Sequence, residues 1–342
     1  MKKRFLSVLL VLFLALSAIG SASLVSSPAA TVNLIRNKAI TNDDVDAMLK
    51  QYQNAGVSAD RSQILDILIN DEVFLQGAER DGALATDQEV ESYVSQLKSQ
   101  LESQVGAQVS DADFESYISA NTGMSLDEYK EGIKESLTVQ KYVLQEKGAE
   151  LQNINTMPTD SQVENFYRKN MQGFFQAENV KLAHVVKLKT DDEKKNEENA
   201  VLMTDVAEKI KNGSITFEQA VSDYTDDAES KALGGDIGWL SIDNQSAITG
   251  FGQDFVDAVM NLKTGEVSGM LESNVGYHIV KVSVHNSGRI LGIDDKINPE
   301  SSETVRDYIV YLLANQNAQN ALANATNELI ADLRSQARIR IY

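Results

Sequence analysis

Hydrophobic residues recur at helical spacing through the first half of this 342-residue chain. An extended segment with apolar Val32 and Leu34 closes in a turn near Asn37, and a helix capped by Thr41 follows it. The apolar face of that helix is predicted at Val45, Met48, Leu49 and Tyr52, which follow the i, i+3, i+4, i+7 spacing. A second helix over about residues 60–80 is richer in large apolar side chains, so we expect it to be mostly buried.

Capping boxes predict the next helices, because each places a hydroxyl three residues before an acidic side chain. They are Thr86 with Glu89, Ser110 with Asp113 and Ser125 with Glu128. The last of these helices is predicted to run to about Lys147 and to end at Gly148.

The second half of the chain contains strand-like alternation at two places. Residues 181–189 (KLAHVVKLK) and 272–282 (ESNVGYHIVKV) each carry a histidine, His184 and His278. Between them, residues 225–240 form an acidic turn that leads into a glycine pair. Such a pair allows a backbone conformation that a side chain would obstruct.

A helix and a short strand are predicted to close the chain. The helix is expected to begin at Pro299, to carry an apolar stripe and to reach about Arg334. Residues 338–342 (RIRIY) read as an alternating strand. We expect this strand to pair with Val32–Arg36, because a lone short strand has no partner for its backbone groups.

Composition narrows the classes of function. A net charge of −19 argues against a nucleic-acid partner, because a surface that follows phosphates needs clustered Lys and Arg. The absence of cysteine excludes disulfides, thiolate metal sites and a cysteine nucleophile. The length allows two domains with cores of their own.

The N-terminus predicts export. Lys2, Lys3 and Arg4 precede an apolar run over residues 5–19, and small residues follow it, so a secretory signal peptide is predicted over residues 1–22. An uncleaved anchor is the alternative, although the run is shorter than the about 20 residues that span a bilayer. We therefore expect an exported protein without a stable membrane span after signal cleavage.

The segments FEQAVSDYTDD, GGDIGW, FVDAVMNLKTGEVSG and GYHIVKV resemble the parvulin family of peptidyl-prolyl isomerases in order and spacing. The resemblance covers about residues 178–286 and implies an inserted βα3βαβ2 domain. The segments VNLIRNKAITNDDVDAML and ILDILINDEVFLQGAERDGALATDQEVESYV resemble the N-terminal module of the SurA and PrsA type of exported folding factors. A plain helical bundle without a client surface is the alternative for that module.

These resemblances imply an α+β protein. Residues 30–176 would form a helical chaperone module, and residues 298–342 would complete it with the closing helix and strand. The parvulin domain would then be an insertion, joined through linkers near Ala177 and Asn286.

The parvulin resemblance also implies the site. The residues at the catalytic positions are His184, Asp227 and His278, and those at the substrate-binding positions are Ile237, Trp239, Leu240, Phe251 and Phe255. Rotation about a prolyl bond needs no nucleophile, so no metal or cofactor is expected. Each assignment has a structural alternative: a histidine pair that satisfies itself in the core, a solvated loop carboxylate, and apolar residues that belong to the core.

Two functions follow from the resemblance. The first is a periplasmic peptidyl-prolyl cis–trans isomerase and chaperone for unfolded or proline-containing exported polypeptides, with outer-membrane proteins as the expected clients. The second is a chaperone that only binds clients, because Phe251 stands where the family commonly has methionine and would narrow the proline pocket. An adhesin or solute-binding protein is a third interpretation, against which the order of the motifs speaks.

Overall fold

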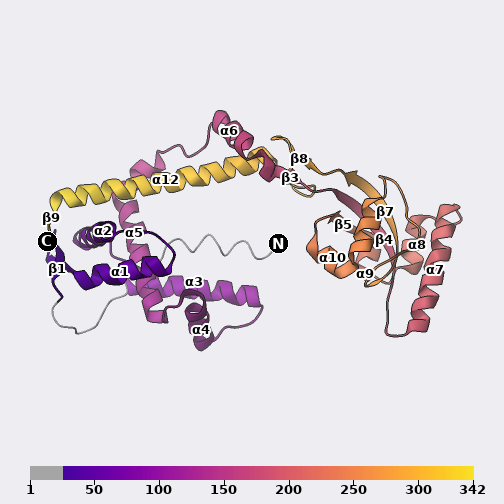
Figure 1. Cartoon of the computed structure of the whole chain (residues 1–342), viewed down its shortest axis with the longest axis horizontal. Helices are drawn as coiled ribbons and strands as arrows, with labels where there is room; N and C mark the ends of the chain where they lie inside the picture. Colours follow the sequence, from indigo (N-terminus) through magenta and orange to yellow (C-terminus); the bar gives the residue numbers. More distant parts are fainter. Residues whose placement is uncertain (1–25) are drawn as a thin grey trace. The chain divides into compact units, whose positions relative to one another are not determined.

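The computed structural model describes residues 26–342, so the predicted signal peptide lies outside the described residues (Figure 1). The chain forms two compact units. The first comprises the described residues up to Thr156 together with Asn315–Tyr342, and the second comprises Met157–Ala314. No helix in this part of the chain combines the length and the apolar character that a bilayer span requires.

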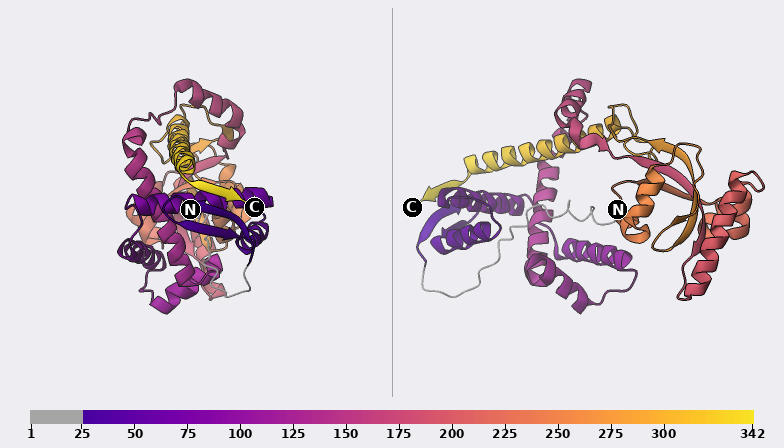
Figure 2. Two further views of the ribbon diagram at one scale, coloured as in Figure 1. Left: turned by 90° about the vertical axis from the view of Figure 1, so that its left-hand side faces the viewer. Right: turned by 45° about the vertical axis from the view of Figure 1, so that its right-hand side comes forward.

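The first unit contains an antiparallel sheet in the order β2-β1-β9. Its strands are β1 (Pro28–Asn33), β2 (Asn37–Thr41) and β9 (Arg338–Ile341). The predicted pairing of the last strand with the N-terminal strand is confirmed, as Figure 2 shows, but the partners are Ala30–Asn33 and not Val32–Arg36. The difference arises because the chain turns after Asn33, where the buried Gln76 accepts the next three backbone N–H groups through its Oε1.

The helices of this unit are α1 (Asn42–Asn54), α2 (Arg61–Arg80), α3 (Asp87–Val105), α4 (Asp111–Thr122), α5 (Leu126–Gln152) and the second part of α12 (Val305–Gln336). Those with a predicted cap, at Thr41, Thr86, Ser110 and Ser125, begin there. Thr41, Thr86 and Ser125 each complete a capping box. The predicted stop at Gly148 is wrong. A glycine inside a helix costs only about 1 kcal/mol, and the helix continues to pack Leu151 against the core.

Two apolar clusters stabilise the first unit. One joins the sheet to α1, α2, α5 and α12 and includes Ile64, Phe74, Tyr142 and Leu333. The other joins α3, α4 and α5 through Val94, Phe114 and Ile133.

The second unit is built on an antiparallel sheet in the order β5-β4-β7-β6. Its strands are β4 (Asn179–Leu188), β5 (Asp236–Ser241), β6 (Leu271–Glu272) and β7 (Gly276–Asn286). Its helices are α7 (Glu193–Lys211), α8 (Phe217–Tyr224), α9 (Ala228–Ala232), α10 (Gln245–Phe251) and α11 (Gln253–Met260). The expected βα3βαβ2 order is therefore present with one short helix more, α10, which Asn244 caps.

Opposite faces of this sheet pack against different helices, because side chains alternate along a strand. Val185 and Ile279 point to the face that α7 and α8 cover. Leu182 and Val280 point to the face that α10 and α11 cover. Figure 1 shows α10 and the pair α7 and α8 on opposite sides of β4 and β7. The same face carries His184, two residues after Leu182, and His278, two residues before Val280.

A smaller layer flanks the sheet within the second unit. It consists of α6 (Asp160–Asn170), the 3-10 helix η1 (Met171–Phe174), β3 (Phe175–Gln176), β8 (Arg289–Ile290) and the start of α12. These segments share an apolar cluster that includes Val163, Phe174 and Val305.

The compact units therefore divide at other residues than the expected boundaries at 176 and 298. Residues 157–176 pack with the segments that follow β7. The closing helix begins at Val305 and not at Pro299, because Thr304 caps it: the Thr304 Oγ1 accepts the Asp307 N–H at 3.1 Å.

Candidate active site

His184 on β4 and His278 on β7 lie side by side in the sheet. Their ring centroids are 5.3 Å apart, and the two Nδ1 atoms are 3.3 Å apart. The antiparallel register places them diagonally, because His184 pairs with Val280 and His278 pairs with Val186. His278 is fully buried and His184 is 5% exposed, so neither ring opens widely to solvent.

The histidines belong to a chain of hydrogen bonds. The Nε2 of His184 lies 3.4 Å from the Asp227 carboxylate and 3.2 Å from the Ser230 hydroxyl. The Nε2 of His278 lies 2.8 Å from the Ser273 hydroxyl. Because an ionised carboxylate only accepts hydrogen bonds, the Nε2 of His184 carries the proton that faces Asp227.

This assignment fixes both tautomers. With its proton on Nε2, the neutral His184 accepts at Nδ1, so the Nδ1–H of His278 donates to it. The Nε2 of His278 then accepts the hydroxyl proton of Ser273. The donors point in one direction, from Ser273 through the two imidazoles to Asp227.

Burial keeps both rings neutral. Desolvation lowers the pKa of His278 to about 3, and the neighbouring His184 and Lys189 act in the same direction. Desolvation also lowers the pKa of His184, although the hydrogen bond with Asp227 opposes it. Hydrogen bonds from Ser230, above all from its hydroxyl, hold the pKa of Asp227 below its usual value. The contact between His184 and Asp227 is therefore a hydrogen bond from a neutral imidazole to a carboxylate.

Asp227 is the member of this network that reaches solvent. Its side chain is 33% exposed, whereas His184, His278, Ser230 and Ser273 are all buried. It caps α9 by accepting the Glu229 N–H at 3.1 Å. Asp227 is therefore the polar side chain through which this network meets solvent.

Gly235 lets the acidic turn approach the first histidine closely. The His184 N–H donates to the Gly235 carbonyl at 2.8 Å. A Cβ on Gly235 would lie 2.7 Å from the His184 carbonyl oxygen, and its φ of +87° is a conformation that disfavours side chains. Gly234 also has a positive φ, but a Cβ there would meet open space.

Two phenylalanines pack against the histidine pair from the helices. The Phe255 ring lies 4.8 Å from the His278 ring, and the Phe251 ring lies 5.9 Å from it and 5.2 Å from Phe255. Ile237 and Leu240 belong to the same apolar cluster. Leu240 and Phe255 are buried, whereas Ile237 and Phe251 are half-buried.

Trp239 is the predicted site residue that the structure does not bring to this cluster. It is half-buried on β5 and lies next to Leu240, which points to the other face of the strand. Its contact with substrate stays a prediction, as do the roles of the other site residues.

Ser230 and Ser273 were missing from the predicted site. Ser273 lies in the turn before β7, where its hydroxyl also accepts the N–H groups of Val275 and Gly276. The sequence indicates a turn there, but a bond to a histidine five residues later cannot be read from it.

Comparison with known proteins supports both domain assignments. Residues 184–284 match the PPIC-type PPIase domain, and residues 1–143 match the SurA-like N-terminal domain. The foldase protein PrsA of Clostridium kluyveri is 29% identical over 232 residues, which cover 66% of this chain and 61% of the relative. The chaperone SurA of Saccharophagus degradans is 24% identical over 297 residues, which cover 81% of this chain and 63% of the relative. The chain thus spans about three fifths of the length of these relatives.

Solved structures also align with this chain, at low TM-scores. A Campylobacter jejuni structure from work on two SurA-like chaperones, PEB4 and Cj1289, aligns over 92% of this chain and all of that chain, with a TM-score of 0.40 and 16% identity. PrsA of Bacillus anthracis aligns over 77% and 97%, with a TM-score of 0.28 and 20% identity. The chain thus contains a segment that matches a SurA-like N-terminal domain, followed by a segment that matches a PPIC-type peptidyl-prolyl isomerase domain.

Proposed function

We propose that this chain is a periplasmic peptidyl-prolyl cis–trans isomerase that also acts as a chaperone for exported polypeptides, outer-membrane proteins among them. The observation that carries the proposal is the network of His184, His278 and Asp227 beside Phe251 and Phe255. It combines a carboxylate that reaches solvent with a dry apolar wall.

The geometry suits prolyl isomerisation. The uncatalysed rotation faces a barrier of about 20 kcal/mol, because the planar imide loses its resonance on twisting. A catalyst therefore has to bind the twisted imide more tightly than either planar form. Phe251 and Ile237, which are half-buried, would contact the proline ring, with the buried Phe255 packed against Phe251. Together they would exclude water, and a less polar surround disfavours the charge-separated planar form.

The polar groups would supply orientation and electrostatics. Asp227 is charged at neutral pH and lies at the mouth of the network, so it would act on the imide carbonyl through its field. The neutral His184 and His278 hold that carboxylate and each other in a single arrangement. His278, being fully buried, would act as a positioning residue and would not touch substrate.

Export and client choice rest on other observations. The signal-peptide pattern over residues 1–22 supports transport across a membrane. The absence of cysteine removes the residue that lipid anchoring would use, which favours the periplasm of a two-membrane cell. The names of the relatives, foldase and chaperone, agree with unfolded polypeptides as clients.

The test is a prolyl tetrapeptide assay on the full-length chain and on two single substitutions. Asp227→Asn removes the exposed charge of the network, whereas Asp223→Asn removes a carboxylate that is exposed on α8. We expect Asp227→Asn to lower kcat/KM about tenfold or more and Asp223→Asn to leave it unchanged.

The same assay distinguishes the isomerase from the binding-only alternative. That alternative rests on Phe251, which stands where the family commonly has methionine and whose ring lies 5.2 Å from that of Phe255. A wild-type rate no higher than the uncatalysed one, together with suppressed aggregation of an unfolded client, would replace the isomerase with a binding-only chaperone.

A further inference from the structure

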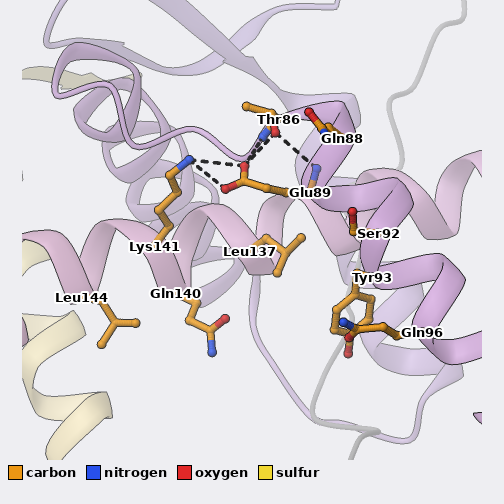
Figure 3. A pocket seen from close by; sticks show the side chains of 10 residues that line it. All are labelled: Thr86, Gln88, Glu89, Ser92, Tyr93, Gln96, Leu137, Gln140, Lys141 and Leu144. Atoms are coloured by element: carbon orange, nitrogen blue, oxygen red, sulfur yellow. Dashed lines mark hydrogen bonds and ion pairs between the residues drawn. The ribbon is translucent and has the colours of Figure 1, made fainter.

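A solvent-open hollow of about 650 Å³ lies between α3 and α5 in the first unit, as Figure 3 shows. Its floor contains Tyr93 and Leu137, which rest on the apolar cluster of α3, α4 and α5. The remaining lining residues are Thr86, Gln88, Glu89, Ser92, Gln96, Gln140, Lys141 and Leu144.

The charges of this hollow cancel. The Lys141 Nζ lies 3.1 and 3.3 Å from the two carboxylate oxygens of Glu89, and the same carboxylate accepts the backbone N–H and the hydroxyl of Thr86 (Figure 3). Because no other lining residue is charged, the hollow is neutral on a chain whose net charge is −19. A neutral lining favours an uncharged ligand over an ion.

The lining also offers unused hydrogen-bonding groups. Gln88, Gln96 and Gln140 make no side-chain hydrogen bond within residues 26–342. Each amide presents one carbonyl and one NH₂ group, which match the N–H and C=O of a peptide bond. Beside them, Tyr93 is half-buried and Leu144 is 55% exposed. The hollow therefore combines backbone-like polar partners with places for apolar side chains.

These features fit an extended peptide better than a folded element. A helix or sheet has already satisfied its backbone groups, whereas an unfolded segment has N–H and C=O groups to offer. From Thr86 to Gln96 the wall on α3 is about 15 Å long, which corresponds to about four or five extended residues.

We infer that the hollow between α3 and α5 binds a short, uncharged, extended segment of an unfolded polypeptide. The glutamine amides would contact the backbone of that segment, and Tyr93, Leu137 and Leu144 would contact its apolar side chains. This rests on the proposed function, since it gives the chaperone activity a location in the first unit, remote in sequence from the isomerase site.

The test is fluorescence anisotropy of the full-length chain with the acetylated and amidated peptide GSFSVSFSG, carrying a neutral dye. Ser92→Trp fills the hollow, and Ser116→Trp, at an exposed serine on α4 outside the lining, is its matched control. Gln96→Ala combined with Gln140→Ala removes the amides, and Gln100→Ala, exposed on the same helix as Gln96, controls for it. Circular dichroism confirms that each variant is folded.

We expect Ser92→Trp to weaken binding by about tenfold or more and the double glutamine variant by about three- to tenfold, with both controls unchanged. A probe that is N-methylated at its Phe and Val residues should bind the wild type as weakly as the parent peptide binds the double variant. Equal affinity of the Ser92→Trp and Ser116→Trp chains would overturn the inference and leave the isomerase proposal untouched. A wild type that binds no probe would also overturn the inference, whereas the chaperone part of the proposed function fails only if the chain does not suppress the aggregation of an unfolded client.

Discussion

The buried His278 predicts that acid destabilises the second unit well above the pH at which carboxylates titrate. In the unfolded chain a histidine has a pKa of 6.5, whereas burial lowers the pKa of His278 to about 3. The neutral ring thus contributes stability that is complete above pH 6.5 and is lost as the pH falls toward the folded value. At pH 5, which is about 1.5 units below 6.5, the loss is about 2 kcal/mol, since one unit corresponds to about 1.4 kcal/mol.

Urea unfolding of the full-length chain between pH 7 and pH 5 measures this loss. Trp239 is the single tryptophan of the chain and lies on β5, so its fluorescence reports on the sheet that holds the histidines. The substitution His278→Gln keeps a donor and an acceptor but cannot titrate. It should lower the stability at pH 7 and reduce the loss between pH 7 and pH 5 by about 2 kcal/mol. Equal pH slopes for the wild type and His278→Gln would refute the assignment of a neutral, buried ring.

Three further substitutions test the contacts around the two sheets. Gly235→Ala should cost at least about 2 kcal/mol more in unfolding free energy than Gly234→Ala, because only the first collides with the His184 carbonyl; equal midpoints in urea would contradict this. Gln76→Met should lower the unfolding free energy by about 2–3 kcal/mol, since it leaves backbone N–H groups without an acceptor. An unchanged Tm of the first unit, measured by calorimetry of the full-length chain, would disprove it. His285 donates from both ring nitrogens to oxygen atoms, and these bonds raise its pKa. The stability that His285 contributes is therefore complete below pH 6.5 and is lost as the pH rises through the pKa of the folded state. His285→Gln should lower the unfolding free energy by about 1 kcal/mol at pH 6 and by little at pH 9. A loss that grows with pH would contradict this assignment.

Local chemistry explains which elements could be predicted. The capping boxes at Thr86 and Ser125 lie within four residues, so the helix starts follow from the sequence alone. The helix ends depend on distant contacts. Gly148 does not stop α5, because Leu151 gains a place in the core beyond it. α12 does not start at Pro299, because the side chain that accepts a backbone N–H at the helix start is that of Thr304.

The candidate site also contains residues that could be predicted from the sequence and residues that could not. His184 and His278 are 94 residues apart, and the resemblance to a family, rather than any spacing, predicted that they meet. The order of donors depends on Ser273 and Ser230, whose hydroxyls reach the rings only after the chain has folded. Trp239 shares a motif with Leu240, yet the alternation of β5 separates their side chains.

Long-range ¹H–¹⁵N NMR of the histidine rings tests the central claim most directly, because the full-length chain has only three histidines. At pH 6.5 we expect a neutral His184 with its proton on Nε2, a neutral His278 with its proton on Nδ1, and a larger doubly protonated fraction for His285 than for a free histidine. Substitution of each histidine by glutamine assigns the signals. An imidazolium at position 278, or the opposite tautomers in the pair, would contradict the one-way network that ends at Asp227.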